Sequence, residues 1–189
     1  MLHRMLGGLR RGFKANSLWT NTLTCGILLT GGDIIQQRID QSLNASSSNN
    51  SYDYVRTGRM CAVGLSQGPP HHYWYIWLDR YLPKRDLRTV CFKILADQIL
   101  AAPFFALTFF FGMGLLEDRR ISEIWKEFLN KFPTIYIFDW CIWPPTQYIN
   151  FKWVPPHFRV LYVNIVTLIW DVFLSFIKHI DEDEKNHRT

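Results

Sequence analysis

Charged residues are almost absent from five long stretches of this chain, and this segregation constrains the fold more than any other feature of the sequence. The stretches are 18 to 23 residues long and contain four charged residues between them, all of them aspartates. They cover 15–37, 60–78, 94–116, 132–151 and 160–177. At 1.5 Å per residue, each stretch forms a helix of about 27–35 Å, close to the roughly 30 Å hydrocarbon core of a bilayer. The pattern predicts an all-α, polytopic membrane helix bundle.

The composition excludes several other classes of protein. Hydrophobic residues make up 48% of the chain and charged residues 20%, which is too apolar for a disordered chain. The net charge is only +5, and the basic residues are spread between the uncharged stretches. We therefore expect no DNA-binding face, which needs a contiguous basic stripe. The four cysteines form no C-x-x-C pair, so they predict neither a disulfide framework nor a metal site, and no cofactor is expected.

The first 17 residues form a basic segment with three arginines, one lysine and no acidic residue. This composition is typical of a mitochondrial targeting segment, although a plain basic flank that orients the first helix has the same composition. We expect three regions in the chain: this basic segment over 1–17, one membrane-embedded helical domain over 18–180, and an acidic tail over 181–189.

Residues 117–131 separate the third and fourth uncharged stretches and show helical periodicity. Apolar side chains recur there at the i, i+3, i+4, i+7 and i+8 spacing of one helix face. They are Ile121, Ile124, Trp125, Phe128 and Leu129. The segment predicts an amphipathic helix at the membrane interface. The bundle would then contain five transmembrane helices and this interfacial helix, or four if one uncharged stretch lies shallow or re-entrant.

A single aspartate interrupts each of four uncharged stretches, at Asp33, Asp97, Asp139 and Asp171. An acidic side chain at bilayer depth costs about 2.5–3.5 kcal/mol on insertion scales, so each should face protein or water rather than lipid. Two interpretations stay open. The aspartates line a lumen or ion path, or they hold the bundle together through interhelical hydrogen bonds and ion pairs.

Glycines and prolines within the stretches predict closely packed, kinked helices. The spacing of Gly64 and Gly68 permits a close approach between helices. Proline pairs at 69–70 and 144–145, together with Pro103, each remove a backbone donor and free a carbonyl that a neighbour must satisfy.

One short motif matches a catalytic pattern on paper. Residues 64–68 read G-L-S-Q-G, the G-x-S-x-G spacing of a hydrolase nucleophile elbow. That motif functions only on a strand–turn–helix, whereas this copy lies in an uncharged stretch and continues into two prolines. The adjacent pair His71-His72 has no third metal ligand at a suitable spacing. We expect no catalytic residues and no enzymatic activity.

Longer stretches carry a family resemblance. They are GPPHHYWYIWLDRYLP at 68–83, KILADQILAAPFF at 93–105, DWCIWPPTQYINFKWVPPHFR at 139–159 and LYVNIVTLIWDVFLSFIKH at 161–179. Together they resemble the Mpv-seventeen and peroxisomal-membrane-protein-twenty-two family, whose signature is similar to W-P-x-x-Q-x-x-N-F-x-x-V-P-x-x-x-R. The matching positions are Trp143, Pro144, Gln147, Asn150, Phe151, Val154, Pro155 and Arg159.

The resemblance implies a small, multi-pass protein of the mitochondrial inner membrane or the peroxisomal membrane, usually with four crossings. The lead-in Asp139-Trp140-Cys141 and the T-N-T-L opening at 20–23 are most similar to one branch of the family. That branch is linked to mitochondrial ribosome assembly and mitochondrial translation. The implied partners are the large ribosomal subunit or its assembly factors, the lipid bilayer and anionic lipid. Some other relatives are proposed to form channels for small solutes or ions, which is the alternative function.

The candidate functional residues are aspartates at membrane depth and residues of the signature. They are Asp97, Asp139, Trp143, Pro144, Gln147, Asn150, Arg159 and Asp171. We hypothesise that Arg159 pairs with Asp139 or Asp171 and so neutralises a costly buried acid. The competing hypothesis is that Arg159 extends to phosphate headgroups at the membrane surface.

Overall fold

Helices account for almost all of the described chain. The computed structural model describes residues 17–43, 51–84, 86–153 and 159–186. The helices are α2 (Ser17–Leu43), α3 (Tyr54–Tyr81), α4 (Leu87–Ala96), η1 (Asp97–Ala101), α5 (Ala102–Leu116), α6 (Ile121–Lys152) and α7 (Arg159–Asn186). Each of the five uncharged stretches lies within a long helix, apart from a few terminal residues, which confirms the predicted all-α fold. Helix α7 continues into the predicted acidic tail.

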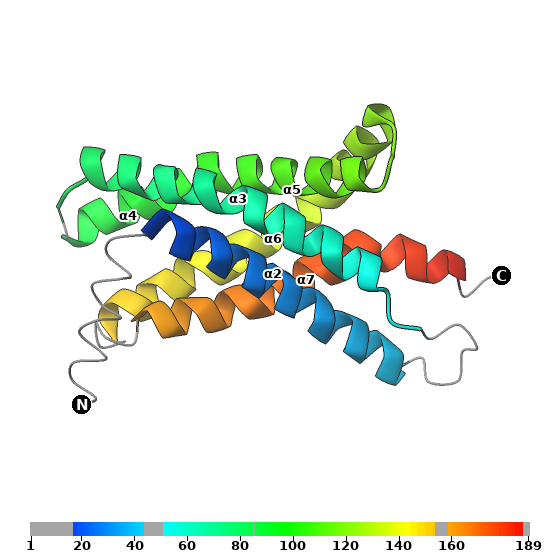
Figure 1. Ribbon diagram of the computed structural model, residues 1–189. Coiled ribbons are helices and arrows are strands. Elements are labelled where there is room, and N and C mark those ends of the chain that lie inside the picture. The colour runs from blue at the N-terminus through cyan, green and yellow to red at the C-terminus, as the bar shows by residue number, and fades with distance from the viewer. Residues whose placement is uncertain (1–16, 44–50, 85, 154–158, 187–189) are drawn as a thin grey trace.

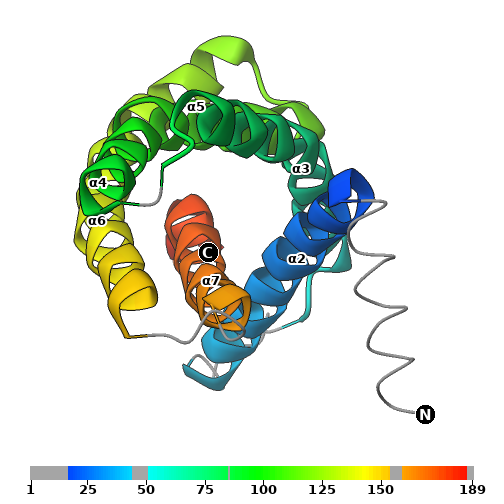
Figure 2. The same ribbon diagram turned by 90° about the vertical axis from the view of Figure 1, so that its left-hand side faces the viewer.

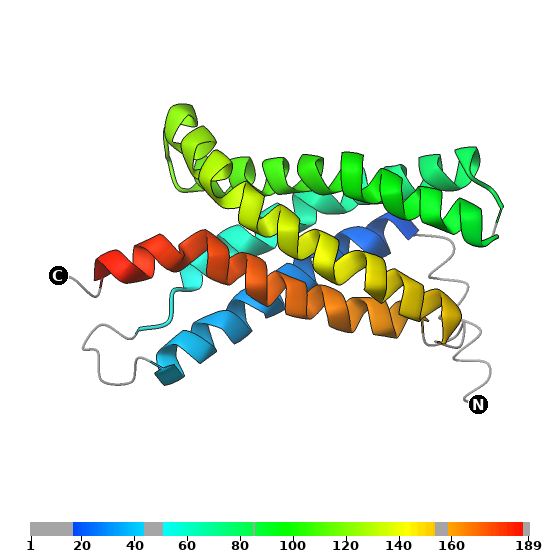
Figure 3. The same cartoon turned by 180° about the vertical axis from the view of Figure 1, so that it is seen from behind.

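The long helices lie side by side along the bundle (Figure 1). Seen along the bundle, α2, α3, α5 and α6 follow one another around an arc, and α7 lies on its inner side (Figure 2). Helix α2 packs against α3 and α7, and α6 packs against α5 and α7. The view from behind shows α6 and α7 next to each other (Figure 3). Helix α7 therefore contacts both ends of the arc.

The outer surface of the bundle is apolar, whereas many of the buried side chains are polar. Trp19 and Ile27 on α2, and Ile165 and Ile169 on α7, are each more than half exposed. The buried polar side chains include Asp33, Gln36, Gln37, Gln98, Asp139 and Asp171. Broad exposed apolar surfaces mark interaction sites, including contact with membranes, and intramembrane acids face the interior of a bundle. This distribution is that of a membrane helix bundle.

Helices α4, η1 and α5 join into one continuous helix, Leu87–Leu116, which is long and apolar enough to cross a membrane. Within the described ranges it is the one helix that meets both conditions of length and composition. Its π-helical turn, η1, ends shortly before Pro103. A proline has no N–H to donate to the carbonyl one turn earlier, and a local π-helical turn is one way in which a membrane helix re-satisfies the backbone groups that a proline frees.

The amphipathic segment 121–131 is not a separate helix, because it forms the first turns of α6. Ile124 and Phe128 are buried, and the Phe128 ring meets Phe110 of α5 with the ring centroids 5.9 Å apart. Trp125 and Leu129 stay about half exposed. The apolar face of the segment is therefore divided: Ile124 and Phe128 are buried in the bundle, whereas Trp125 and Leu129 remain on the outer surface.

Close approach between α2 and α3 depends on glycine. A Cβ atom at Gly64 would lie 2.8 Å from the carbonyl oxygen of Cys25, and a Cβ atom at Gly68 would overlap the backbone of Thr22. The close helix approach predicted for this glycine pair is confirmed. Helix α3 continues through Pro69 and Pro70 without a break in its helical assignment.

Candidate functional site

A cavity of about 380 Å³ lies inside the bundle, and all five long helices contribute to its wall. Three of the four predicted aspartates line it: Asp97 from η1, Asp139 from α6 and Asp171 from α7. We call it the acidic cavity. Residues 32 or more positions apart on separate helices therefore meet here, although each occurs alone in its own stretch of sequence.

Asp97 has a specific partner within the bundle. The indole Nε1 of Trp74, on α3, donates a hydrogen bond of 2.6 Å to Asp97 Oδ1. The next residue, Gln98, is buried, and its backbone carbonyl accepts a hydrogen bond of 3.2 Å from the Tyr136 hydroxyl of α6. The π-helical turn thus holds the wall of the cavity against α3 and α6.

Asp139 and Gln98 each present an unsatisfied oxygen. Both side chains are buried, at 7% and 3% exposure, and both line the acidic cavity. Asp139 Oδ2 and Gln98 Oε1 nevertheless have no hydrogen-bond donor among the residues that the structure describes. A buried acceptor left without a partner costs about 1–3 kcal/mol, so a donor that reached either atom would offset this cost.

Asp171 lies at a close contact between α7 and α2. A Cβ atom at Gly32 would be 2.6 Å from the Asp171 Cβ, so glycine is needed for this contact. The Asp171 side chain is 6% exposed and lines the acidic cavity. No ion pair to it occurs within the described part of the chain.

Two further predicted residues, Trp143 and Gln147, also line the acidic cavity. Pro144 lies within α6 but outside the cavity lining. The side chains of Asn150 and Arg159 lie outside the described residues. The proposed pairing of Arg159 with Asp139 or Asp171 therefore stays a prediction.

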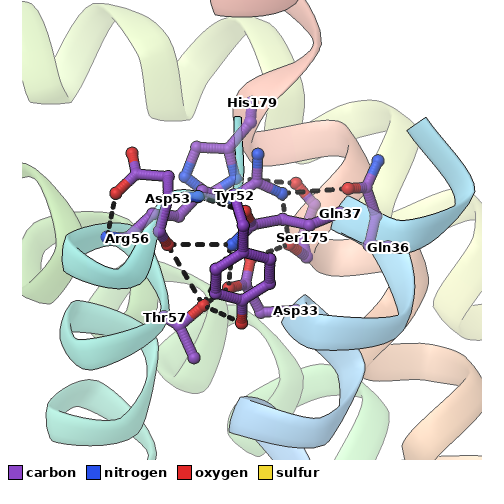
Figure 4. Close-up of polar contacts among 9 residues, drawn as sticks. All are labelled: Asp33, Gln36, Gln37, Tyr52, Asp53, Arg56, Thr57, Ser175 and His179. Atoms are coloured by element: carbon purple, nitrogen blue, oxygen red, sulfur yellow. Dashed lines mark hydrogen bonds and ion pairs between the residues drawn. The ribbon is translucent and has the colours of Figure 1, made fainter. Parts of the chain in front are cut away.

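The fourth aspartate, Asp33, belongs to a separate polar cluster that joins α2, α3 and α7 (Figure 4). Arg56 donates from Nε to Asp33 Oδ1 at 2.8 Å, and the two side chains are 9% and 0% exposed. The hydroxyls of Ser175 and Thr57 donate to the two oxygens of the same carboxylate, at 2.8 and 2.7 Å. The Asp33 charge is thus fully partnered, and the ion-pair interpretation holds for this aspartate.

Glutamine side chains complete this group, which we call the Arg56 cluster. Arg56 Nη2 donates to Gln36 Oε1 at 3.0 Å and to Ser175 Oγ at 2.9 Å. Gln37 donates to Asp33 Oδ2 at 2.9 Å, and its Oε1 accepts from the backbone N–H of Asp53 at 2.8 Å. The cluster fixes the start of α3 against α2 and α7.

A second charged group, which we call the Lys178 cluster, joins α7 to the connection between α5 and α6. The Lys178 side chain is fully buried, and its Nζ lies 2.9 Å from Glu117 and 3.2 Å from Glu127. Glu127 also pairs with Arg119 and with Lys131. Burial disfavours the charged form of Arg119, but the carboxylates of Glu127 and Glu117 outweigh burial and raise the pKa of Arg119 above its ordinary value.

Exposed basic residues gather at the end of the bundle opposite these clusters. The link from α3 to α4 lies at that end (Figure 1). Lys84 lies in this link, and Arg80 and Arg88 lie on the adjoining ends of α3 and α4. All three are exposed, and no ion pair to any of them occurs within the described ranges. The buried cations Arg56 and Lys178 are thus paired with carboxylates, whereas these three project to the surroundings, as Arg120 and Lys126 also do at the start of α6.

Sequence reasoning missed the cations that partner the buried acids. Arg56 and Lys178 lie just outside two of the uncharged stretches, where a basic residue is expected to extend to the membrane surface. Two features of the sequence together could have indicated these partners. Each cation lies close to the end of an uncharged stretch, and another uncharged stretch carries an acidic residue at a similar depth in the membrane.

The G-x-S-x-G motif has no catalytic geometry. Ser66 lies in the middle of α3, and its hydroxyl donates to the Val63 carbonyl of the same helix at 2.7 Å. A nucleophile elbow instead places its serine at a strained turn between a strand and a helix. Among the described residues, no group of three potential ligands is placed to hold a metal ion.

The sequence matches the pattern of the Mpv17 / PMP22 family over residues 114–175. PXMP2/4 family protein 2 of Dictyostelium discoideum is 34% identical over 97% of this chain and 95% of its own. Protein sym1 of Aspergillus oryzae is 32% identical, over 86% and 91%. Peroxisomal membrane protein 2 of Bos taurus is 28% identical, over 91% and 88%. No solved structure matches this chain.

Proposed function

Since this chain belongs to the Mpv17 / PMP22 family of membrane proteins, we propose that it is a non-enzymatic protein of the mitochondrial inner membrane. In this proposal it supports the assembly and stability of the mitochondrial ribosome, and through the ribosome it supports mitochondrial translation. The basic segment 1–17 supports the compartment. The D-W-C lead-in at 139–141 and the T-N-T-L opening at 20–23, which resemble the ribosome-linked branch, support the role.

The observation that carries this proposal is the group of exposed basic residues where α3 is followed by α4. Arg80, Lys84 and Arg88 are exposed there, whereas Arg56 and Lys178 are buried and paired with carboxylates. An end with free cations suits the matrix side, where positive loops are retained, and it attracts RNA phosphates through salt-sensitive contacts. In this proposal that end tethers the large ribosomal subunit or one of its assembly factors to the membrane.

Affinity purification from mitochondria in a mild detergent, followed by mass spectrometry, tests the tether. The proposal predicts enrichment of large-subunit ribosomal proteins with the wild-type chain, and their loss at moderate salt. The double variant Lys84→Glu with Arg88→Glu should lose this enrichment. The matched control is Arg120→Glu with Lys126→Glu, two exposed cations near the start of α6, and it should retain the enrichment.

Two results would overturn the tether. One is the absence of ribosomal proteins from the wild-type sample. The other is equal enrichment with both double variants, because the basic end would then make no contribution. If the basic end binds only vesicles that contain anionic lipid, its charge serves membrane attachment instead.

The acidic cavity favours a second function, a channel for small solutes or ions. Three carboxyl groups in one cavity would attract cations. Purified protein in planar bilayers should then conduct cations, and Asp97→Asn, Asp139→Asn and Asp171→Asn should each lower the selectivity. Asp118→Asn, at an exposed position outside the cavity, is the control. Absent conductance, or conductance that none of the three cavity variants changes, would exclude this function.

A further inference from the structure

The wall of the acidic cavity includes buried hydrogen-bond acceptors that no donor of the described residues satisfies. Asp139 Oδ2 and Gln98 Oε1 are unsatisfied, and both belong to side chains that are more than nine-tenths buried. Asp171 adds a third buried acceptor group to the same wall. Because all three groups present oxygen atoms, a molecule that satisfies them has to bring N–H or O–H donors.

The carboxyl groups of the wall indicate that the ligand is a cation. Asp97, Asp139 and Asp171 line the cavity, and the described residues of the lining include no lysine or arginine. The indole rings of Trp143 and Trp170 belong to the same wall. Aromatic faces attract ammonium groups, and most strongly where water is excluded. We propose that the acidic cavity is a binding site for a small organic ammonium ion with an apolar body.

The size and the lining of the cavity agree with such a ligand. Its volume of about 380 Å³ lies within the range of roughly 300–1,000 Å³ found for small-molecule sites. Leu28, Ile94 and Phe109 supply apolar wall for the body of the ligand. Water alone would satisfy the acceptor atoms but would make no use of the indole faces of Trp143 and Trp170. This site is independent of the ribosomal role, and for the channel alternative it names the class of solute.

Direct binding to the full chain in lipid nanodiscs tests the site. The probe is phenethylammonium, compared with its neutral isostere 2-phenylethanol and with the anion 3-phenylpropionate, by calorimetry. We expect saturable binding of the ammonium ion, at least tenfold tighter than that of the alcohol, and no binding of the anion. Asp139→Asn and Asp171→Asn should each weaken ammonium binding at least tenfold. Asp118→Asn should leave it unchanged, because Asp118 is exposed and its φ of 54° suits asparagine.

Three results would overturn the proposal. The first is equal affinity for the amine and the alcohol, which would make the site merely apolar. The second is ammonium binding that survives in both cavity variants. The third is no binding to the wild type together with binding to Arg159→Ala, because the guanidinium of Arg159 would then be the occupant. The measurement requires no conductance, so a failure of the channel function leaves this test intact.

If an aspartate variant fails to fold, cysteine labelling of the otherwise unchanged cavity tests whether the cavity prefers cations. Cys25 lines the acidic cavity, whereas Cys91 is exposed on α4. Each is kept as the single cysteine of the chain, with the other three changed to serine, and is treated with trimethylammonium-ethyl or sulfonatoethyl methanethiosulfonate. The rate ratio of cationic to anionic reagent should be at least tenfold higher at Cys25 than at Cys91, and phenethylammonium should slow labelling of Cys25 alone. Equal ratios at the two sites would contradict the proposal.

Discussion

Arg56 lies with its Nε atom 2.8 Å from Oδ1 of Asp33, and this buried ion pair joins the start of α3 to the middle of α2. The guanidinium and the carboxylate are both buried, and the Ser175 hydroxyl of α7 donates to the same carboxylate oxygen. The pair therefore connects three helices through one carboxylate. Removing one member of a buried pair leaves the other charge uncompensated, and this loss costs more than the pair itself contributes.

The Arg56→Met variant should lose about 3–5 kcal/mol of unfolding free energy, because Asp33 would keep its burial and lose its counterion. Unfolding in mixed micelles with increasing dodecyl sulfate, followed by circular dichroism, measures the loss. Arg59→Met, on the same helix and without an ion pair in the described chain, should change stability by less than about 0.5 kcal/mol. The double variant Asp33→Leu with Arg56→Met should be more stable than Arg56→Met alone. Equal losses at positions 56 and 59 would contradict this role.

Lys178→Met should also be destabilising, by about 3 kcal/mol or more. The fully buried ammonium group lies between Glu117 and Glu127. Arg119 and Lys131 balance the two carboxylates formally, but without Lys178 the buried Glu117 would keep only the 3.6 Å contact to Arg119. Lys126→Met, an exposed neighbour on α6, should be close to neutral. The same unfolding assay compares the two, and near-equal stability of the two variants would show that the Lys178 cluster contributes little.

Replacing two glycines of α3 by alanine should change the stability of the protein in opposite directions. Gly68→Ala should lower stability by about 1–3 kcal/mol, since the new Cβ would overlap the Thr22 backbone. Gly58→Ala should raise stability by about 0.5–1 kcal/mol, because no atom lies within 4 Å of its Cβ position. A stabilising effect at both positions would mean that α2 and α3 are farther apart than the structure has them.

If the basic end binds ribosomal RNA, the association of the protein with ribosomal particles should depend on salt. Association of the wild-type chain with ribosomal particles should weaken steeply as ionic strength rises, because each phosphate contact releases counterions. Lys84→Gln with Arg88→Gln should make this dependence shallower, whereas Lys126→Gln should leave it unchanged. Sedimentation of the solubilised particles at a series of salt concentrations measures both slopes. Identical slopes for all three proteins would exclude a contribution of the α3–α4 link.

Periodicity and charge segregation were sufficient to predict the helices, because both depend on neighbouring residues. The five uncharged stretches correspond to the long helices, and the spacing of Gly64 and Gly68 predicted the close contact of α2 with α3. The boundaries were less predictable. Residues 121–131 continue into α6 although Pro133 follows, since a proline inside a membrane helix is tolerated when neighbours satisfy the freed carbonyl.

The site could be predicted only in part. An isolated acid in an apolar stretch indicates a polar interior, and three such acids do meet in the acidic cavity. Their different surroundings could not be derived from the sequence. Asp33 has its cation 23 positions away, and Glu117 has its cation 61 positions away. Such pairings depend on how the helices cross, which no local pattern specifies. Gln98 escaped attention for the same reason, because its importance comes from its place beside Asp139.

The most direct test of the central proposal is mitochondrial translation in cells that lack this protein. Pulse-labelling of mitochondrially encoded polypeptides and gradient sedimentation of ribosomal particles are measured together. We predict reduced labelling and depleted large subunits, both restored by the wild-type chain and neither restored by Lys84→Glu with Arg88→Glu. Normal labelling and a normal particle profile in the absence of the protein would contradict the proposed function.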